Sequence, residues 1–366
     1  MRITAVRTIG WRQPAIPIHA GRFGGTQDIV LVEVEVEGGL VGQGTARAHG
    51  GQSGEGIAEA VVKSLKPLLV GQDAWSRQAL WQRMVALEPA GYVPVFAISA
   101  VDVALWDLAG KATGQPIHRL LGSRHPRMRA YASSAHLPDA AAYVAEARGC
   151  VERGYTAYKV HPFGDPARDI ELCRALREAV GPKVDLMLDP AKGYDRAGAL
   201  RVGRVLDDLG FAWYEEPIAQ ADIAGHAELR AALDLPLAGA ETVPGHVQAA
   251  AQFLRADALD LVLCDVYWKA GITGMLRTAA LVEAWGLQVA SHHAASPLMN
   301  VANLHVLCGA TNADRVGVLV PEAGYEYGLR HYPRPDASGF LVPPDAPGLG
   351  VEVDRDFIER HTVFQR

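Results

Sequence analysis

The sequence predicts an α/β fold, namely a TIM-like (β/α)8 barrel with an N-terminal α+β capping domain that the C-terminal segment completes. Three observations support this prediction. The chain has 366 residues, more than a single core usually organises, so a smaller domain should accompany a large one. Eight short apolar strands alternate with helical stretches from about 127 to 321. Most of these strands end in a residue that can bind a metal or move a proton.

Residues 1–125 mix strand and helix patterns and are expected to form the capping domain. Within them, 28–46 alternates apolar and polar side chains around Gly38 and Gly39, which is typical of a strand pair joined by a turn. Spaced apolar positions then predict three helical stretches, at 54–70, 76–88 and 95–113, the last of which ends near Gly114.

Residues 126–322 are expected to form the barrel. The predicted strands are, in chain order, 127–134, 156–161, 183–189, 211–217, 235–241, 259–265, 287–292 and 316–321. A doubly wound open sheet has a similar local pattern, but this number of strands favours a closed parallel barrel. The remaining residues 323–366, rich in Pro and Gly, are expected to pack back on the capping domain.

The overall charge and the cysteines exclude several classes of protein. A net charge of -6, from 35 basic and 41 acidic residues without a basic block, disfavours binding to nucleic acid or to an anionic membrane. The four cysteines lack CxxC spacing, so we expect neither a zinc site nor a disulfide framework, and a reducing cytoplasm fits. The first residues lack a signal-peptide pattern, and no uncharged apolar run approaches the ~20 residues of a membrane span. We therefore expect a cytoplasmic protein.

Side chains at the carboxyl ends of the predicted strands are the candidates for chemistry, because the loops that follow the strands form the open face of a parallel barrel. Six of the eight strands end in a residue that can bind a metal or move a proton, and a seventh is followed by one. These residues are His161, Asp189, Glu215, Glu241, Asp265, His292 and Glu322.

Asp189, Glu215 and Glu241 end three consecutive predicted strands at equal intervals of 26 residues. Neighbouring strands would bring the three carboxylates together, and hard oxygen ligands with room left for water and substrate suit Mg²⁺. Any one of them alone could instead cap the helix that follows it. All three on adjacent strands favour a metal site.

Histidine and lysine side chains supply candidates for proton transfer. Asp265 beside His292 would fix the tautomer of the ring and favour its protonated form, although the adjacent His293 leaves open which histidine is functional. Lys159 and His161 are two residues apart on one strand, so both should point into the mouth of the barrel. The alternatives are a packed or capping histidine and a surface lysine, but the strand around Lys159 is otherwise apolar.

Two stretches of the chain resemble the mandelate racemase branch of the enolase superfamily, and the resemblance covers nearly the whole sequence. The first, SAVDVALWDLAGKATGQPIHRLLG at 99–122, resembles the helix and loop that join the family's capping domain to its barrel. The second is Asp189 followed by YEEP at 214–217, where the first Glu of the motif matches a metal ligand of the family.

The resemblance implies roles for the residues already singled out. It implies three Mg²⁺ ligands, a carboxylate–histidine dyad on one side of the substrate, a Lys–His pair on the other, and a glutamate that hydrogen-bonds the substrate carboxylate. The positions that match these roles are, in the same order, Asp189, Glu215 and Glu241, then Asp265 and His292, then Lys159 and His161, and last Glu322. Related barrels are usually homo-oligomers, so by analogy we expect one here.

Three positions depart from the pattern of the family. His161 stands where many members have the second Lys of Lys-x-Lys, which leaves the second acid or base open. Ala191 stands where Asn is common, so a hydrogen bond near the metal is lost or taken over by Lys192. Lys269 lies in a loop instead of pointing inward from the sixth strand, which favours the mandelate racemase branch over the muconate-lactonising one.

The resemblance also implies a reaction. An α-proton beside a carboxylate is weakly acidic, and this superfamily removes it with a Lys or His base and Mg²⁺. We expect dehydration of an acid sugar, an aldonate or aldarate, to a 2-keto-3-deoxy acid, with His19, Arg22 and His49 of the cap loops binding the substrate beside Arg47. The alternatives are a cycloisomerase of a cyclic or anhydro sugar acid, a racemase or epimerase, and, from another class, a non-catalytic barrel.

Overall fold

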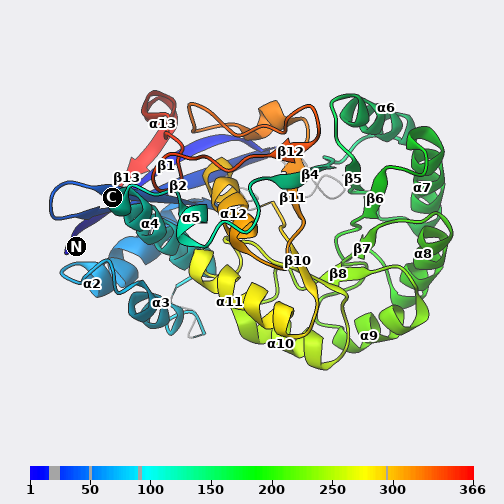
Figure 1. Cartoon of the computed structure of the whole chain (residues 1–366), viewed down its shortest axis with the longest axis horizontal. Coiled ribbons are helices and arrows are strands. Elements are labelled where there is room, and N and C mark those ends of the chain that lie inside the picture. The colour runs from blue at the N-terminus through cyan, green and yellow to red at the C-terminus, as the bar shows by residue number, and fades with distance from the viewer. Residues whose placement is uncertain (16–24, 49–51, 90–92, 294–295) are drawn as a thin grey trace.

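The chain is organised around two sheets, one in each half of the molecule (Figure 1). The computed structural model describes residues 1–15, 25–48, 52–89, 93–293 and 296–366. The first sheet and its helices lie on one side, together with both termini, and the ring of barrel helices lies on the other. No helix in these ranges is both long enough and apolar enough to cross a membrane.

The first sheet is antiparallel and has four strands, in the order β13-β1-β2-β3. Their bounds are Ile3–Ala15 (β1), Gly25–Val36 (β2), Val41–Ala48 (β3) and Thr362–Gln365 (β13). The predicted strand pair is confirmed as β2 and β3, and the sheet also contains β1 and β13, which the sequence did not predict. Arginines and a glycine in β1 obscure its alternation in the sequence, and β13 becomes a strand only because it meets β1.

Helices cover one face of this sheet. They are α1 (Glu55–Glu59), the π-helical η1 (Ala60–Leu65), α2 (Lys66–Leu69), α3 (Arg77–Val85), α4 (Val95–Thr113) and α5 (Ile117–Leu120). The long helix α4 packs directly on β3, where a Cβ on Gly44 would stand 2.1 Å from the carbonyl oxygen of Ala100. Only glycine allows so close an approach of the two backbones. The three helical stretches predicted at 54–70, 76–88 and 95–113 are confirmed.

The second sheet has nine strands, of which eight run parallel in a ring and the ninth, β12 (Phe340–Leu341), pairs antiparallel with the first of the eight. The parallel strands are β4 (Met128–Ser133), β5 (Ala157–Val160), β6 (Asp185–Leu188), β7 (Trp213–Glu215), β8 (Leu237–Gly239), β9 (Leu261–Leu263), β10 (Gln288–Ala290) and β11 (Arg315–Leu319). Each pairs with its neighbour in chain order, β11 pairs with β4, and a parallel bridge between Val289 and Ala313 closes the ring. The predicted fold class is confirmed.

Helices follow the barrel strands on the outside of the ring. They are α6 (Ala140–Glu152), α7 (Pro166–Val180), α8 (Arg196–Asp208), α9 (Ile223–Ala232), α10 (His246–Arg255), α11 (Gly271–Ala284) and α12 (Pro297–Gly309). The chain then passes through η2 (Glu322–Tyr325), β12 (Phe340–Leu341) and α13 (Arg355–His361) before β13 returns to the first sheet. We propose that the capping domain ends near residue 125 and the barrel near 322.

The barrel strands end earlier than the sequence predicted. Of the seven candidates for chemistry, only Glu215 lies inside a strand, and the others follow their strands by one to three residues. The prediction that these residues terminate the strands is corrected accordingly. They belong to the first residues of the loops at the open face of the barrel.

Candidate active site

A layer of apolar side chains fills the interior of the barrel, and the site lies next to this layer, toward the carboxyl ends of the strands. Seven strands each contribute one buried residue to this layer, namely Tyr131, Ala157, Met187, Trp213, Ala238, Leu263 and Ala290. Side chains two residues apart along a strand point the same way. Counting two residues onward gives the inward positions of the next layer, among them Lys159, Asp189, Glu215, Asp265 and His292.

Glu241 breaks this rule, because the inward position after Ala238 is Ala240. Ala240 adopts a left-handed backbone conformation with φ of 67°, which reverses the alternation and turns Glu241 to the interior. The carbonyl oxygen of Ala240 accepts a hydrogen bond of 2.7 Å from Nζ of Lys269, a fully buried lysine. The amide of Glu241 donates to Oε1 of Glu216 at 3.1 Å. These two contacts hold the turn that directs Glu241.

Lys159 links two of the carboxylates. Its Nζ lies 2.6 Å from Oε1 of Glu215 and 3.2 Å from Oδ2 of Asp189, and all three side chains are buried. Burial alone would lower the pKa of Lys159, but the charges of Glu215 and Asp189 raise it well above its usual value. Lys159 therefore stays cationic. The indole Nε1 of Trp213 donates to the other oxygen of Glu215 at 3.0 Å and fixes that carboxylate.

The three carboxylates carry more negative charge than their surroundings neutralise. Burial, helped by the charges of Asp189 and Glu241 and opposed by Lys159, raises the pKa of Glu215 to about 8. Burial and the charge of Glu216 raise the pKa of Glu241 well above its usual value. Within the described ranges, no three His, Cys, Asp or Glu side chains are already arranged around one point as a metal site. The chemistry of the donors nevertheless fits a hard divalent cation, which would relieve this repulsion.

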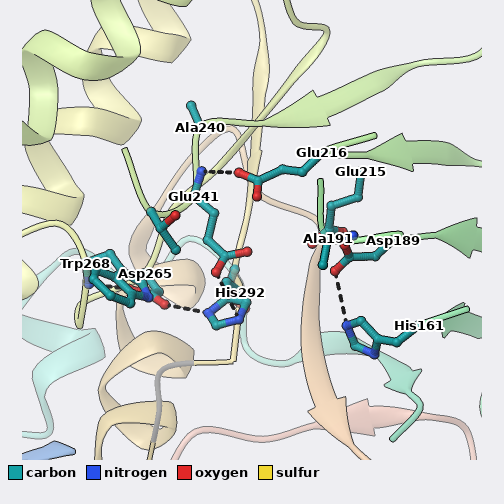
Figure 2. Close-up of polar contacts among 12 residues, drawn as sticks. His161, Asp189, Ala191, Glu215, Glu216, Ala240, Glu241, Asp265, Trp268 and His292 are labelled. Atoms are coloured by element: carbon teal, nitrogen blue, oxygen red, sulfur yellow. Dashed lines mark hydrogen bonds and ion pairs between the residues drawn. The ribbon is translucent and has the colours of Figure 1, made fainter. Parts of the chain in front are cut away.

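Two histidines approach these carboxylates from opposite sides, as Figure 2 shows. Nδ1 of His292 lies 2.9 Å from Oδ2 of Asp265, and its Nε2 lies 3.1 Å from Oε1 of Glu241. We assign the ring hydrogen of neutral His292 to Nδ1, because the carboxylate of Asp265 can only accept there. Nε2 is then the nitrogen that can take up a proton.

His161 repeats this arrangement on the other side. Its Nδ1 lies 2.6 Å from the carbonyl oxygen of Ser134, which can only accept, and its Nε2 lies 3.1 Å from Oδ2 of Asp189. Both histidines therefore present Nε2 to the carboxylates and hold Nδ1 against a fixed acceptor. Two imidazoles so placed can take a proton from a molecule between them, or give one to it.

A small cavity of about 30 Å³ lies between the two histidines. Its lining residues are Arg47, Tyr131, Ser133, Lys159, His161, His292, His293, Gly317 and Leu319. A larger hollow of about 450 Å³ shares Arg47 with it and extends toward the capping domain, where Phe96, Tyr267 and Trp268 contribute aromatic walls. The larger hollow has room for a small molecule, and Arg47 connects it with the small cavity between the histidines.

Glu322 is not brought to this cavity. It begins η2, and its Oε1 accepts a hydrogen bond of 2.8 Å from Tyr155 and lies 3.5 Å from Arg153. Both partners come just before β5, away from the residues that line the cavity. The structure therefore does not place Glu322 with the other predicted site residues. The predicted substrate-binding residues His19, Arg22 and His49 lie outside the described residues.

Several neighbours of the site were missed in the sequence. Trp213 could have been found, because it lies two residues before Glu215 on the same face of a strand. Tyr131 occupies the equivalent inward position on β4. Lys192, expected to replace a hydrogen bond of the absent Asn, has its Nζ 3.1 Å from Oε2 of Glu216. The bond to Asp189 comes instead from the amide of Ala191, at 2.9 Å.

Comparison with known proteins agrees with this architecture. The family model described as "Mandelate racemase / muconate lactonizing enzyme, N-terminal domain" matches residues 3–122, and the model "Enolase C-terminal domain-like" matches 142–357. The chain is 31% identical to D-galactarolactone cycloisomerase of Agrobacterium fabrum over 97% of both chains. It is 30% identical to arabinonate dehydratase of Saccharolobus solfataricus, over 91% of this chain and 90% of that protein.

A solved structure is similar throughout its length. The crystal structure of D-glucarate dehydratase from Agrobacterium tumefaciens complexed with magnesium covers 100% of both chains, with a TM-score of 0.90 and 30% identity. Dehydratases are lyases and cycloisomerases are isomerases, so the relatives match both predicted classes of enzyme. The matched models, relatives and fold show that the chain belongs to the mandelate racemase and muconate lactonizing enzyme family of the enolase superfamily.

Proposed function

We propose that this enzyme removes the α-proton of a carboxylate substrate in a Mg²⁺-dependent reaction, and that the reaction is the dehydration of an acid sugar to a 2-keto-3-deoxy acid. The observation that carries the proposal is the pair of histidines, each with Nδ1 tied to an acceptor and Nε2 facing the three buried carboxylates. The arabinonate and D-glucarate dehydratases among the relatives support the choice of dehydration.

The carboxylates would serve as the metal ligands. Asp189, Glu215 and Glu241 offer hard oxygen donors whose mutual repulsion a divalent cation would relieve. Mg²⁺, when bound, would supply the positive charge that makes the α-proton of a neighbouring carboxylate more acidic. The related structure crystallised with magnesium supports this choice of metal. Lys159, held cationic, would add a second positive charge beside the substrate carboxylate.

The histidines would move the protons. Nε2 of His292 takes the proton from C2 of the substrate, and the charge of Asp265 stabilises the imidazolium that forms. The C3–O bond then breaks, and His161, in its protonated form, gives the proton on Nε2 to the departing hydroxyl, which leaves as water. The resulting enol takes a proton from solvent at C3, loses the proton of its C2 hydroxyl and becomes the 2-keto acid. His292 is assigned as the base because its Nδ1 partner is a carboxylate, whereas that of His161 is a neutral carbonyl.

A second reaction remains a candidate because of one relative. The similarity to D-galactarolactone cycloisomerase extends over 97% of the chain, and a histidine on each side could also return a proton to carbon. A cycloisomerase or an epimerase would therefore use the same residues. The two reactions differ in outcome, because only dehydration releases water and gives a 2-keto product from an open-chain acid sugar.

A library of aldonates and aldarates, incubated with the enzyme and Mg²⁺, tests the proposal. Semicarbazide detects any 2-keto product, and we expect at least one member to give it. The variant Asp189→Asn should lose this activity, whereas Asp185→Asn, at the opposite end of the same strand, should keep it. Isomerisation without loss of water would contradict dehydration and identify the enzyme as a cycloisomerase or epimerase. A complete lack of reaction with every member would contradict both.

A further inference from the structure

Three buried polar atoms on the capping side of the site have no hydrogen-bond partner among the described residues. They are Nε of Arg47, Nδ1 of His293 and Oη of Tyr325. They come from three separate elements, namely β3, the loop after β10, and η2. A buried polar group without a partner costs on the order of 1–3 kcal/mol, so three in one place indicate a missing ligand.

These residues lie together. Arg47 and His293 line the same cavity as the catalytic candidates Lys159, His161 and His292. The rings of His293 and Tyr325 are in contact, with centroids 5.6 Å apart. Burial raises the pKa of Tyr325 and the nearby guanidinium of Arg47 opposes that change, which places the arginine and the phenol in the same surroundings.

Arg47 has no carboxylate partner among the ion pairs of the described residues. Its Nη1 donates to the neutral Oε1 of Gln27 over a long distance of 3.5 Å. The phenol of Tyr327 is a further hydrogen-bond partner of Arg47. The charge of Asp265 also acts on Arg47, but both oxygens of Asp265 are already engaged by His292 and by the amide of Trp268. The guanidinium of Arg47 is thus partly buried without a carboxylate partner among the described residues, which suits an anionic ligand.

The position of Arg47 suits a group at the far end of a substrate. Arg47 is the residue shared by the small cavity around the histidines and the larger hollow toward the capping domain. Lys159 and His161, which line that small cavity, both contact Asp189, one of the carboxylates proposed as metal ligands, and Arg47 comes from the capping sheet. A molecule held at both ends would span the two histidines.

We propose that Arg47, His293 and Tyr325 bind a second carboxylate of the substrate, so that the enzyme acts on dicarboxylic sugar acids in preference to monocarboxylic ones. This inference rests on the proposed function and narrows its substrate class. A carboxylate accepts from a guanidinium in a charge-assisted bond, and its remaining lone pairs suit an imidazole N–H and a phenol O–H. A terminal hydroxymethyl group would leave the charge of Arg47 unpaired.

The test compares two acid sugars of the same configuration, an aldarate and the aldonate in which the distal carboxylate is a hydroxymethyl group. The wild-type enzyme should favour the aldarate in kcat/KM by about 30-fold or more, the range expected of a charge-assisted hydrogen bond. Arg47→Met should remove most of that preference, because it should raise KM far more for the aldarate than for the aldonate. Arg47→Lys should restore part of it. Arg7→Met, at an exposed position of the same sheet, is the control.

Calorimetry of the binding of both compounds distinguishes the dicarboxylate assignment from the proposed dehydration. If the wild type turns a compound over, its binding is measured in the His292→Asn variant, which should bind without reacting. Preferential, Arg47-dependent binding of the aldarate without any turnover in the wild type would contradict dehydration and retain the dicarboxylate assignment. Equal affinity for the two compounds, or an equal loss for both in Arg47→Met, would overturn the assignment even if dehydration occurs. Tyr325→Phe, which removes a single hydroxyl, should weaken the aldarate alone.

Discussion

Asp265 determines which nitrogen of His292 faces the substrate. One oxygen of Asp265 lies 2.9 Å from Nδ1 of His292, and the other accepts from the amide of Trp268 at 2.6 Å. The carboxylate thus both orients the ring and balances the charge that the ring gains with a proton.

We predict that Asp265→Asn lowers kcat by about 100-fold or more, the usual contribution of general acid–base catalysis. The oxygen of the asparagine can still accept from Nδ1, but the side chain carries no negative charge to stabilise the imidazolium. Proton transfer to Nε2 is therefore disfavoured. Steady-state kinetics measure the effect, and calorimetry should show Mg²⁺ affinity within about threefold of the wild type. An unchanged kcat would remove His292 from the role of base.

Lys269 supports the turn that directs Glu241, through its hydrogen bond to the carbonyl oxygen of Ala240. We predict that Lys269→Met weakens Mg²⁺ binding by about tenfold, in the range measured for partners of metal ligands. Methionine fills the same buried volume but cannot donate, so Ala240 loses its restraint. Calorimetric titration with Mg²⁺ tests this, with the exposed Lys183→Met as control. Equal affinities in both variants would show that Lys269 only fills space.

Helix α4 of the cap is joined to α11 of the barrel by a buried network. Thr273 donates to Asp102 twice, from its amide at 2.9 Å and its hydroxyl at 2.7 Å, and that hydroxyl also accepts from Nε1 of Trp106 at 2.9 Å. One side chain of the barrel therefore binds two side chains of the cap helix.

Removing the hydroxyl should loosen this connection. We predict that Thr273→Val lowers the free energy of unfolding by about 3 kcal/mol, because it leaves Trp106 without its acceptor and one oxygen of Asp102 without its donor in a buried place. Thr113→Val, at the exposed end of α4, should change it far less. Denaturant titration measures both variants, and equal small effects would mean that the network is dispensable.

The elements of the barrel were largely predictable, and the reason is periodicity. Strand alternation in the sequence predicted that Lys159 points inward, and the structure places it two residues after the interior Ala157. Asp189 and Asp265 were found from their places at the ends of the predicted strands. The turn at Ala240 was not predictable, since nothing in an alanine indicates a left-handed conformation. The 26-residue spacing from Glu215 suggested that Glu241 joins the other carboxylates, but it is the turn at Ala240 that directs the side chain inward.

The position of Glu322 could not be predicted, because it depends on contacts with residues far away in the sequence. Its place after the eighth strand suggested a role in the site, but η2 begins there and the carboxylate binds Tyr155, which is 167 residues away in the sequence. Similarly, β1 and β13 are strands because they meet each other and β2 across the whole length of the chain. No local pattern contains that information.

The C-terminal segment is tied to both halves of the molecule through two stacked histidines. His305 of α12 donates from Nε2 to the carbonyl oxygen of Leu349, and its Nδ1 accepts from the amide of His118 in α5 at 3.2 Å. Burial lowers the pKa of His305 to about 4, well below the usual 6.5, so the folded protein keeps this ring neutral.

This burial makes the whole fold sensitive to acid. The folded pKa of His305 lies below the unfolded one, so its contribution to stability is intact above pH 6.5 and is lost as the pH falls toward 4. Between pH 7 and pH 5 the wild type should lose about 2 kcal/mol more than His305→Gln, which does not titrate and retains a donor for Leu349. Urea titrations at several pH values test this, and parallel losses in both proteins would contradict it.

The most direct measurement follows the hydrogen at C2 of an acid-sugar substrate in D₂O, with the enzyme first stripped by chelator and then given Mg²⁺. With Mg²⁺, we predict loss of the C2 hydrogen and one deuterium at C3 of the 2-keto product, and neither should occur without Mg²⁺ or in Glu215→Gln. Turnover that persists in the stripped enzyme, or in Glu215→Gln, would show that the three carboxylates do not hold the metal on which the chemistry depends.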